Sequence, residues 1–310
     1  MEQIKDRVIY GAMNIGGGWN TDLDKETIEK GIKTLEKAYE IGIRIYDHAN
    51  IYTMGKSESV FGEFLKANPI RKDLFIQSKA GIIIGGGSNR YDFSKKHLIT
   101  EVEESLKRLN ISYMDRFILH RPDPIFDRKE LKSAIDEMFN NGWIKSIGVS
   151  NMSHYQIEMF EEIIERKMTC NQLELSLSHL DFINEGVDFN TPAYKESIVA
   201  GTLEYCMKKG IELQSWGAMS QGAFTGRNLQ GYDVNYVRTA GIISRIAHEK
   251  NISKESVLLS WLMMHPAHIM PVVGTTSVSR LENIKDCMTT KLSRDEWYEI
   301  YISQRGYDLP

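Results

Sequence analysis

Eight short apolar segments, separated by longer amphipathic segments, are the feature that most limits the fold of this chain. The apolar segments are Val8–Ala12, Ile43–Asp47, Leu74–Ser78, Arg116–Leu119, Ser146–Val149, Cys170–Glu174, Glu212–Trp216 and Met270–Val273. The segments with helical periodicity are Lys25–Ile41, Ser94–Leu109, Lys129–Asn141, Ser153–Arg166, Tyr194–Lys209, Val237–Lys250 and Lys254–His265. Strands that alternate with helices in this way predict a parallel α/β architecture.

Two parallel architectures fit this alternation, a closed barrel and an open doubly wound sheet. An open sheet usually carries Gly-x-Gly-x-x-Gly after its first strand. The glycine clusters at Gly16–Gly18 and Gly85–Gly87 have neither that spacing nor the spacing of a Walker A loop. Polar residues follow nearly every predicted strand, as the rim of a barrel requires. We therefore expect residues 1–310 to form one (β/α)8 TIM barrel domain.

Composition excludes several classes of protein. The 310 residues carry a net charge of −4, so no basic excess is available for a nucleic-acid partner. Three widely spaced cysteines indicate a reducing compartment and predict neither a disulfide framework nor a metal site. Residues 1–7 lack the apolar core of a signal peptide, and Val257–Gly274 is interrupted by histidine and proline. We expect a cytoplasmic protein with no membrane partner.

Four polar residues, Asp47, Tyr52, Lys79 and His120, lie at or just beyond the ends of predicted strands. Free tyrosine has a pKa of about 10, and a nearby cation such as Lys79 lowers it. Asp47 can hold Lys79 by an ion pair, and His120 can orient a substrate oxygen or assist proton transfer. Such a group can protonate a carbonyl oxygen, but no side chain donates hydride, so a nicotinamide cofactor is implied.

The later strand ends offer groups for that cofactor. Ser150, Asn151 and Gln172 carry hydroxyl and amide groups suited to a nicotinamide carboxamide. The flat face of Trp216 suits ring stacking. The remaining candidate contacts at strand ends are Gly11, Met13, Asp47 and Gly217.

The turn after the last strand suits a phosphate group. Gly274, Thr275, Thr276 and Ser277 open a predicted helix, whose free N–H groups attract anions. Arg280 is placed to pair with a 2′-phosphate, as found in NADPH. Each of these features also has a purely structural interpretation. The structural alternative is a plain helix cap for the turn, a satisfied core histidine for His120, and a structural ion pair for Lys79 with Asp47, and the functional interpretation is preferred for all three. Trp19 either lines the substrate pocket or packs on the surface.

In combination these motifs resemble the aldo-keto reductase family from about Val8 to the C-terminus. The matching motifs are Asp47-x4-Tyr52, Lys79, His120, Gly148-Val149-Ser150-Asn151, Asn171-Gln172 and Gly274–Arg280. The segment His120–Pro124 and the ending Arg305–Pro310 look most like the YdhF-like bacterial branch. The resemblance implies that Tyr52 is the proton donor, that Lys79 and Asp47 tune it, that His120 positions the carbonyl, and that NADPH is the reductant.

The chain departs from the family pattern at four places. The N-terminal β-hairpin is short or missing, since the first strand begins near Val8. Gly274 replaces a lysine that many members carry, and Trp216 replaces their stacking tyrosine. Asn283, a candidate adenine contact, lies closer to Arg280 than its counterpart does in many members.

The sequence thus predicts an NADPH-dependent oxidoreductase that reduces an aldehyde or ketone to an alcohol. Its expected partner is a small carbonyl substrate, and NAD is the less favoured cofactor. One alternative is a cofactor-binding, redox-sensing regulatory barrel with little turnover. The other is a phosphate-handling barrel enzyme that needs no nicotinamide. Turnover of simple aldehydes would distinguish a reductase from the regulatory barrel. Absence of NADPH binding would favour the phosphate-handling enzyme.

Overall fold

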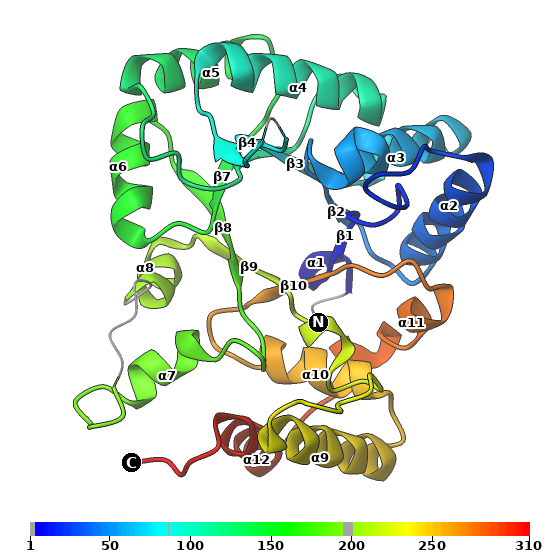
Figure 1. Ribbon diagram of the computed structural model, residues 1–310, viewed down its shortest axis with the longest axis vertical. Coiled ribbons are helices and arrows are strands. Elements are labelled where there is room, and N and C mark those ends of the chain that lie inside the picture. The colour runs from blue at the N-terminus through cyan, green and yellow to red at the C-terminus, as the bar shows by residue number, and fades with distance from the viewer. Residues whose placement is uncertain (1–3, 86, 195–200) are drawn as a thin grey trace.

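The protein is a closed barrel of eight parallel strands surrounded by helices (Figure 1). The computed structural model describes residues 4–85, 87–194 and 201–310. The strands are β1 (Ile9–Gly11), β2 (Ile45–Asp47), β3 (Phe75–Ala80), β6 (Arg116–Leu119), β7 (Ile147–Ser150), β8 (Met168–Glu174), β9 (Glu212–Trp216) and β10 (Met270–Val273). The barrel closes because β1 pairs with both β2 and β10, so the predicted (β/α)8 architecture is confirmed.

The helices form a ring around the barrel (Figure 1). The longer ones are α2 (Lys25–Glu40), α3 (Lys56–Ala67), α4 (Lys95–Leu109), α5 (Arg128–Asn140), α6 (His154–Ile164), α8 (Thr202–Lys209), α9 (Val234–Lys250), α10 (Lys254–Met263) and α12 (Arg294–Arg305). Shorter ones are α1 (Ile4–Arg7), α7 (Asp181–Val187) and α11 (Val278–Glu282). The predicted helices are present, except that residues 195–200 of Tyr194–Lys209 lie outside the described residues. Helices α1, α3, α7 and α12 were not predicted.

The pairing register brings polar side chains of neighbouring strands together. Asp47 is paired with Gln77, and Gln77 in turn with Arg116 on the next strand. Because side chains alternate along a strand, Gln77 and Lys79 share one face of β3 and Ser78 takes the other. The Ser78 hydroxyl lies 2.6 Å from a carboxylate oxygen of Glu58 on α3, so Ser78 faces the helices.

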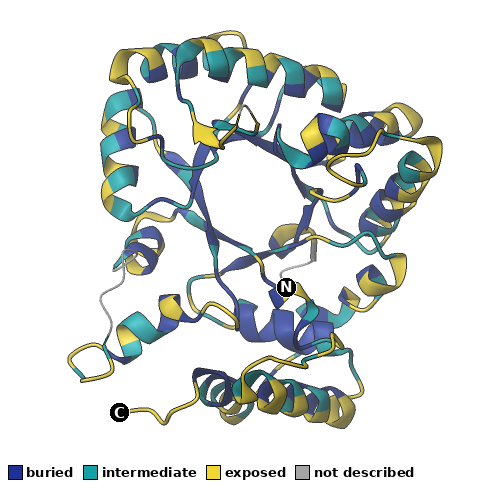
Figure 2. Cartoon of the chain, viewed as in Figure 1, coloured by how far each residue is buried: buried dark blue, intermediate teal, exposed yellow. Residues whose placement is uncertain are grey.

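Helix α10 shows how the apolar segment near the C-terminus is used. It is buried along nearly its whole length, because α9 and α12 cover the side that faces away from the barrel (Figure 2). Trp261 of α10 stacks on Trp297 of α12 at a centroid distance of 5.3 Å. The segment Val257–Gly274 is thus a helix, a turn and β10, as expected. No helix among the described residues has both the length and the apolar character to span a bilayer.

No β-hairpin precedes β1 among the described residues. Helix α1 leads directly into β1, as the late start of the first strand predicted. Arg7 donates to the carbonyl oxygens of Met263 and Ile269, both at 3.3 Å, and so ties this segment to the barrel wall. A separate antiparallel pair, β4 (Ile82–Ile83) and β5 (Arg90–Tyr91), follows β3.

Candidate active site

The four predicted catalytic residues meet at the carboxyl end of the barrel. Asp47 ends β2, Lys79 lies near the end of β3, and His120 directly follows β6. Tyr52 begins the short 3-10 helix η1 (Tyr52–Gly55) after β2. The Lys79 Nζ donates to Asp47 Oδ2 at 2.6 Å and lies 4.8 Å from the centroid of the Tyr52 ring. The Tyr52 and His120 rings face each other edge-on, with centroids 6.2 Å apart.

The turn that presents Tyr52 is held in an unusual conformation. Thr53 and Met54 both have positive φ, 47° and 60°, which is costly for a β-branched residue such as Thr53. The Thr53 and Ser57 hydroxyls lie 2.9 Å apart, and Ser57 also accepts the Gly16 N–H. A side chain on Gly16 would place its Cβ 2.3 Å from Thr53 Oγ1. Gly16 therefore allows the close packing that fixes the turn containing Tyr52.

Charge and burial act in opposite directions on Tyr52. Burial raises the pKa of Tyr52 above its ordinary value, and this exceeds the lowering effect of the Lys79 charge. The expected lowering by Lys79 is thus present, but it does not bring the pKa below that of free tyrosine. For Lys79 itself, burial lowers the pKa, but Asp47 and Tyr52 together outweigh this effect and leave the pKa raised. The site therefore holds a protonated phenol beside a stable cation.

His120 is a neutral group in this site. Burial, followed by the charges of Lys79 and Arg121, lowers the pKa of His120 well below its ordinary value. Its Nδ1 is buried and has no hydrogen-bond partner among the described residues. A neutral imidazole can donate a hydrogen bond to a substrate oxygen through one nitrogen.

A cavity of about 800 Å³ opens from these residues across the barrel mouth. The predicted site residues that line it are Gly11, Met13, Trp19, Asp47, Tyr52, His120, Ser150, Asn151, Gln172, Trp216, Gly217, Gly274, Thr275 and Arg280. Lys79 is buried behind this wall, with only 1% of its surface exposed. The predicted cofactor residues Thr276, Ser277 and Asn283 are not in the wall, so their proposed direct contacts gain no support from it.

One wall of the cavity is a fixed network of amides. The Trp216 indole donates to Asn151 Oδ1 at 3.0 Å, and Asn151 Nδ2 donates to the Ser150 hydroxyl at 2.8 Å. Gln172 Nε2 donates to Asp47 Oδ1 and to Gln214 Oε1 at 3.0 and 2.9 Å. Both donors of Gln172 are used, so its Oε1 is the atom left to accept from a ligand. This wall suits the NH2 group of a carboxamide.

The far end of the cavity lies at α11. The Ser277 hydroxyl accepts the Arg280 N–H and caps this helix, so the structural interpretation of this turn holds for Ser277. Thr275 and Arg280 nevertheless face the cavity, and Arg280 is exposed. Nearby, Asn283 Nδ2 donates to Glu255 at 3.2 Å, and Glu255 lines the cavity. The exposed guanidinium of Arg280 at this end fits a phosphate group.

Sequence reasoning missed several residues of the cavity wall. Arg121 and Glu174 line it, and both lie at strand ends where polar residues are expected to be functional. Tyr232 and Tyr236 reach it from the connection between β9 and α9 and from the start of α9. No sequence motif marks these two tyrosines.

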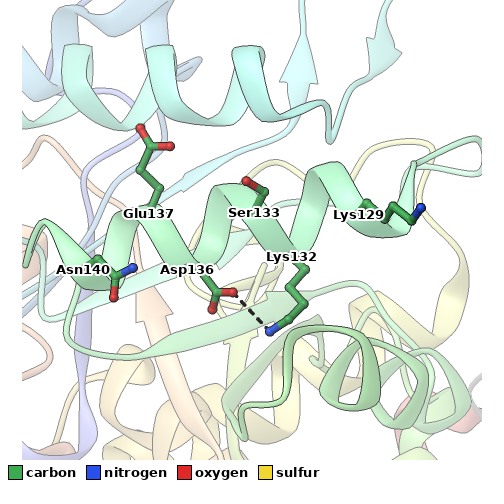
Figure 3. A pocket seen from close by; sticks show the side chains of 6 residues that line it. All are labelled: Lys129, Lys132, Ser133, Asp136, Glu137 and Asn140. Carbon is green, nitrogen blue, oxygen red and sulfur yellow. Dashed lines mark ion pairs between the residues drawn. The ribbon is translucent and has the colours of Figure 1, made fainter.

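A second hollow lies on the outer surface of α5 (Figure 3). Its six lining residues all come from this helix, and Lys132 pairs with Asp136 at 3.1 Å. Facing charges on one helix are typical of a solvated surface. We assign no chemistry to it.

Comparisons with known proteins agree with this geometry. The sequence profile of the Aldo/keto reductase family matches residues 7–303. The uncharacterized oxidoreductase YcsN of Bacillus subtilis (strain 168) is 31% identical over 98% of this chain and 96% of its own length. Oxidoreductase YdhF of Escherichia coli (strain K12) is 26% identical over 90% of this chain and 89% of its own, in agreement with the predicted branch. The structure of a glycerol dehydrogenase from Gluconobacter oxydans superposes with a TM-score of 0.80 at 21% identity, covering 98% and 94% of the two chains.

Proposed function

This chain belongs to the aldo/keto reductase family, and from that premise we propose that it reduces an aldehyde or ketone to the alcohol with NADPH. The observation that carries the proposal is the grouping of Tyr52, Lys79 and His120 at one end of a cavity large enough for a dinucleotide. We place this activity in the cytoplasm, since all three cysteines are free and buried.

Each catalytic residue has a separate role in this proposal. The Tyr52 hydroxyl donates its proton to the carbonyl oxygen, and the Lys79 charge stabilises the phenolate that forms. Asp47 keeps Lys79 in place through the 2.6 Å ion pair. His120, which stays neutral, donates a hydrogen bond that orients the carbonyl. Trp19 lines the same cavity and contacts the rest of the substrate in this proposal.

The remaining cavity residues fit a reduced nicotinamide dinucleotide. When bound, that cofactor supplies the hydride for the carbonyl carbon. Gln172 Oε1 and Asn151 hold the carboxamide, and Trp216 presents its ring face. Gly217 has φ of +71°, a conformation that favours glycine, so no side chain projects from the wall beside Trp216. Thr275 and Arg280 line the far end of the cavity, where Arg280 would pair with the 2′-phosphate that NADPH carries and NADH lacks, which supports NADPH over NADH.

Replacement of Tyr52 by phenylalanine tests the proposal. Tyr52→Phe should lower kcat for aldehyde reduction at least a hundredfold, because phenylalanine has no proton to donate. The substitution removes general acid catalysis and should leave cofactor binding intact. The dissociation constant of NADPH, measured by fluorescence titration, should change less than twofold. Tyr46→Phe is the matched control, since the Tyr46 hydroxyl is buried with no partner among the described residues. Its kcat should equal that of the wild type.

The same measurements separate the two alternatives. A wild-type protein that binds NADPH but turns over no aldehyde or ketone would be a regulatory barrel. A protein that binds no nicotinamide cofactor would contradict the proposal altogether. Neither the comparisons nor the cavity favours the phosphate-handling alternative, because the matching family is one of oxidoreductases.

A further inference from the structure

Beneath the catalytic residues, the barrel interior contains a buried chain of amide and charged side chains. Gln77, Gln172 and Gln214 come from β3, β8 and β9, and each is at most 2% exposed. Arg116 and Glu212 begin β6 and β9, so they lie at the opposite end of the barrel from the cavity. Buried amides are costly unless every donor and acceptor is used, so the connections of this chain matter.

The upper part of the chain ends on Asp47. Gln77 Nε2 donates to Asp47 Oδ1 and to Gln214 Oε1, both at 2.7 Å. Gln172 Nε2 donates to the same two oxygens at 3.0 and 2.9 Å. Asp47 Oδ1 is thus held by two amide donors, and its Oδ2 is left for Lys79 at 2.6 Å.

The lower part of the chain ends on Arg116 and Glu212. Gln77 Oε1 accepts from Arg116 at 3.1 Å and from Gln214 Nε2 at 3.0 Å. Gln214 Nε2 also donates to Glu212 at 2.6 Å, and Arg116 donates to Glu212 at 2.8 Å.

The two charged ends fix the direction of every bond between them. A carboxylate only accepts and a guanidinium only donates, so the Gln77 nitrogen must face Asp47 and its oxygen must face Arg116. The orientation of Gln214 follows from that of Gln77. Neither amide has an alternative orientation that keeps these bonds, and both are fully used.

We propose that Gln77 is a positioning residue for the proton-transfer site, acting through Asp47. It sets the rotation of the Asp47 carboxylate, which in turn holds Lys79 between Asp47 Oδ2 and the His48 carbonyl oxygen at 2.8 Å. Gln77 itself does not line the cavity. The inference rests on the proposed function, since the geometry of Asp47 and Lys79 matters for rate only if Tyr52 donates a proton.

The first test is the variant Gln77→Met, which keeps the side-chain length and removes the donor and the acceptor. The expected kcat for carbonyl reduction is at least tenfold lower, while KM and the NADPH dissociation constant change less than twofold. If the variant still binds one NADPH per chain, it is folded, and the lower kcat does not come from unfolded protein. Ser78→Ala is the matched control, because it removes a buried hydrogen bond from the other face of the same strand. Its kcat should stay at the wild-type value.

The second test needs neither cofactor nor turnover. The melting temperature is measured for wild type, Gln77→Met, Asp47→Ala and the double variant. If Gln77 acts through Asp47, Gln77→Met lowers the melting temperature less in the Asp47→Ala background than in wild type. Equal losses in both backgrounds would overturn the inference.

A third variant covers the case in which Gln77→Met does not fold. Gln77→Glu keeps the volume and the contact with Arg116 but turns an acceptor toward Asp47, so kcat should again fall at least tenfold. If the wild type is active and kcat is unchanged in either variant, the positioning role is refuted, while the proposed function is not. A wild type without carbonyl reduction refutes the proposed function, while the thermal comparison still decides whether Gln77 and Asp47 are coupled.

Discussion

At the scale of single residues, the central feature is a tyrosine whose environment keeps it protonated. Burial raises the pKa of Tyr52, and the Lys79 charge only reduces that effect. A general acid must carry its proton when the carbonyl arrives, and the raised pKa keeps Tyr52 protonated through neutral pH. The neighbouring cation then acts mainly after the proton has left, when it stabilises the phenolate.

This balance predicts the pH dependence of the reaction. The active form of Tyr52 is protonated, so activity is present below its pKa and is lost as the pH rises through it. Since that pKa lies above the ordinary value of about 10, kcat/KM for reduction should be flat between about pH 7 and 9. Lys79→Met should lower kcat at least a hundredfold and leave this range flat. A wild-type kcat/KM that falls between pH 7 and 9 would contradict the assignment.

At the scale of elements, the barrel strands could be predicted from sequence, whereas the short helices α1 and α7 and the longer helices α3 and α12 were missed. The eight apolar segments coincide with the barrel strands to within about two residues. Helix α3 has a readable pattern in Val60, Phe61 and Phe64, but it begins directly after the irregular turn that contains Tyr52. Helix α12 carries a capping box between Ser293 and Glu296, which is also visible in the sequence.

The candidate site shows where sequence reasoning stops. Asp47, Tyr52, Lys79 and His120 were predicted as a catalytic group because each lies at or just beyond a strand end, with a recognisable spacing. Alternation along β3 places Gln77 on the same face as Lys79, but the partners of Gln77 come from β2, β6 and β9. Their identity depends on the register between strands that are distant in sequence, and apolar patterns do not encode that register.

Helix α11 carries the prediction about cofactor choice. Arg280→Ala should weaken NADPH binding roughly tenfold, since a hydrogen bond to a charged group contributes about 1.5 kcal/mol or more. NADH binding should stay nearly unchanged. The matched control is Lys285→Ala, because Lys285 is exposed and pairs with Glu282 but does not line the cavity. Equal losses for both cofactors in a titration would show that Arg280 does not contact the 2′-phosphate.

At the scale of the whole molecule, side chains of α12 and of the residues after it bind the connection between β8 and α8. Arg305 of α12 donates to Asp188 at 2.5 Å, and the Tyr307 hydroxyl donates to the other carboxylate oxygen at 2.8 Å. Tyr301 reaches Asn184 of α7 at 2.6 Å. The same connection supplies Ser176 and Ser178 to the cavity wall, so the last helix supports one side of the site.

Loss of this buried ion pair should destabilise the protein far more than loss of an exposed one. Arg305→Met leaves the Asp188 charge buried and uncompensated, which costs about 3 kcal/mol or more and should lower the melting temperature by several degrees. The matched control is Arg245→Met, since Arg245 pairs with Glu299 at the same 2.5 Å but both side chains are more than 40% exposed. Its effect should stay below about 1 kcal/mol. Adding Asp188→Asn to Arg305→Met should restore part of the lost melting temperature, because the uncompensated charge is removed. Equal effects of the two arginine variants on the melting temperature would show that the Arg305–Asp188 ion pair contributes no more to stability than an exposed ion pair does.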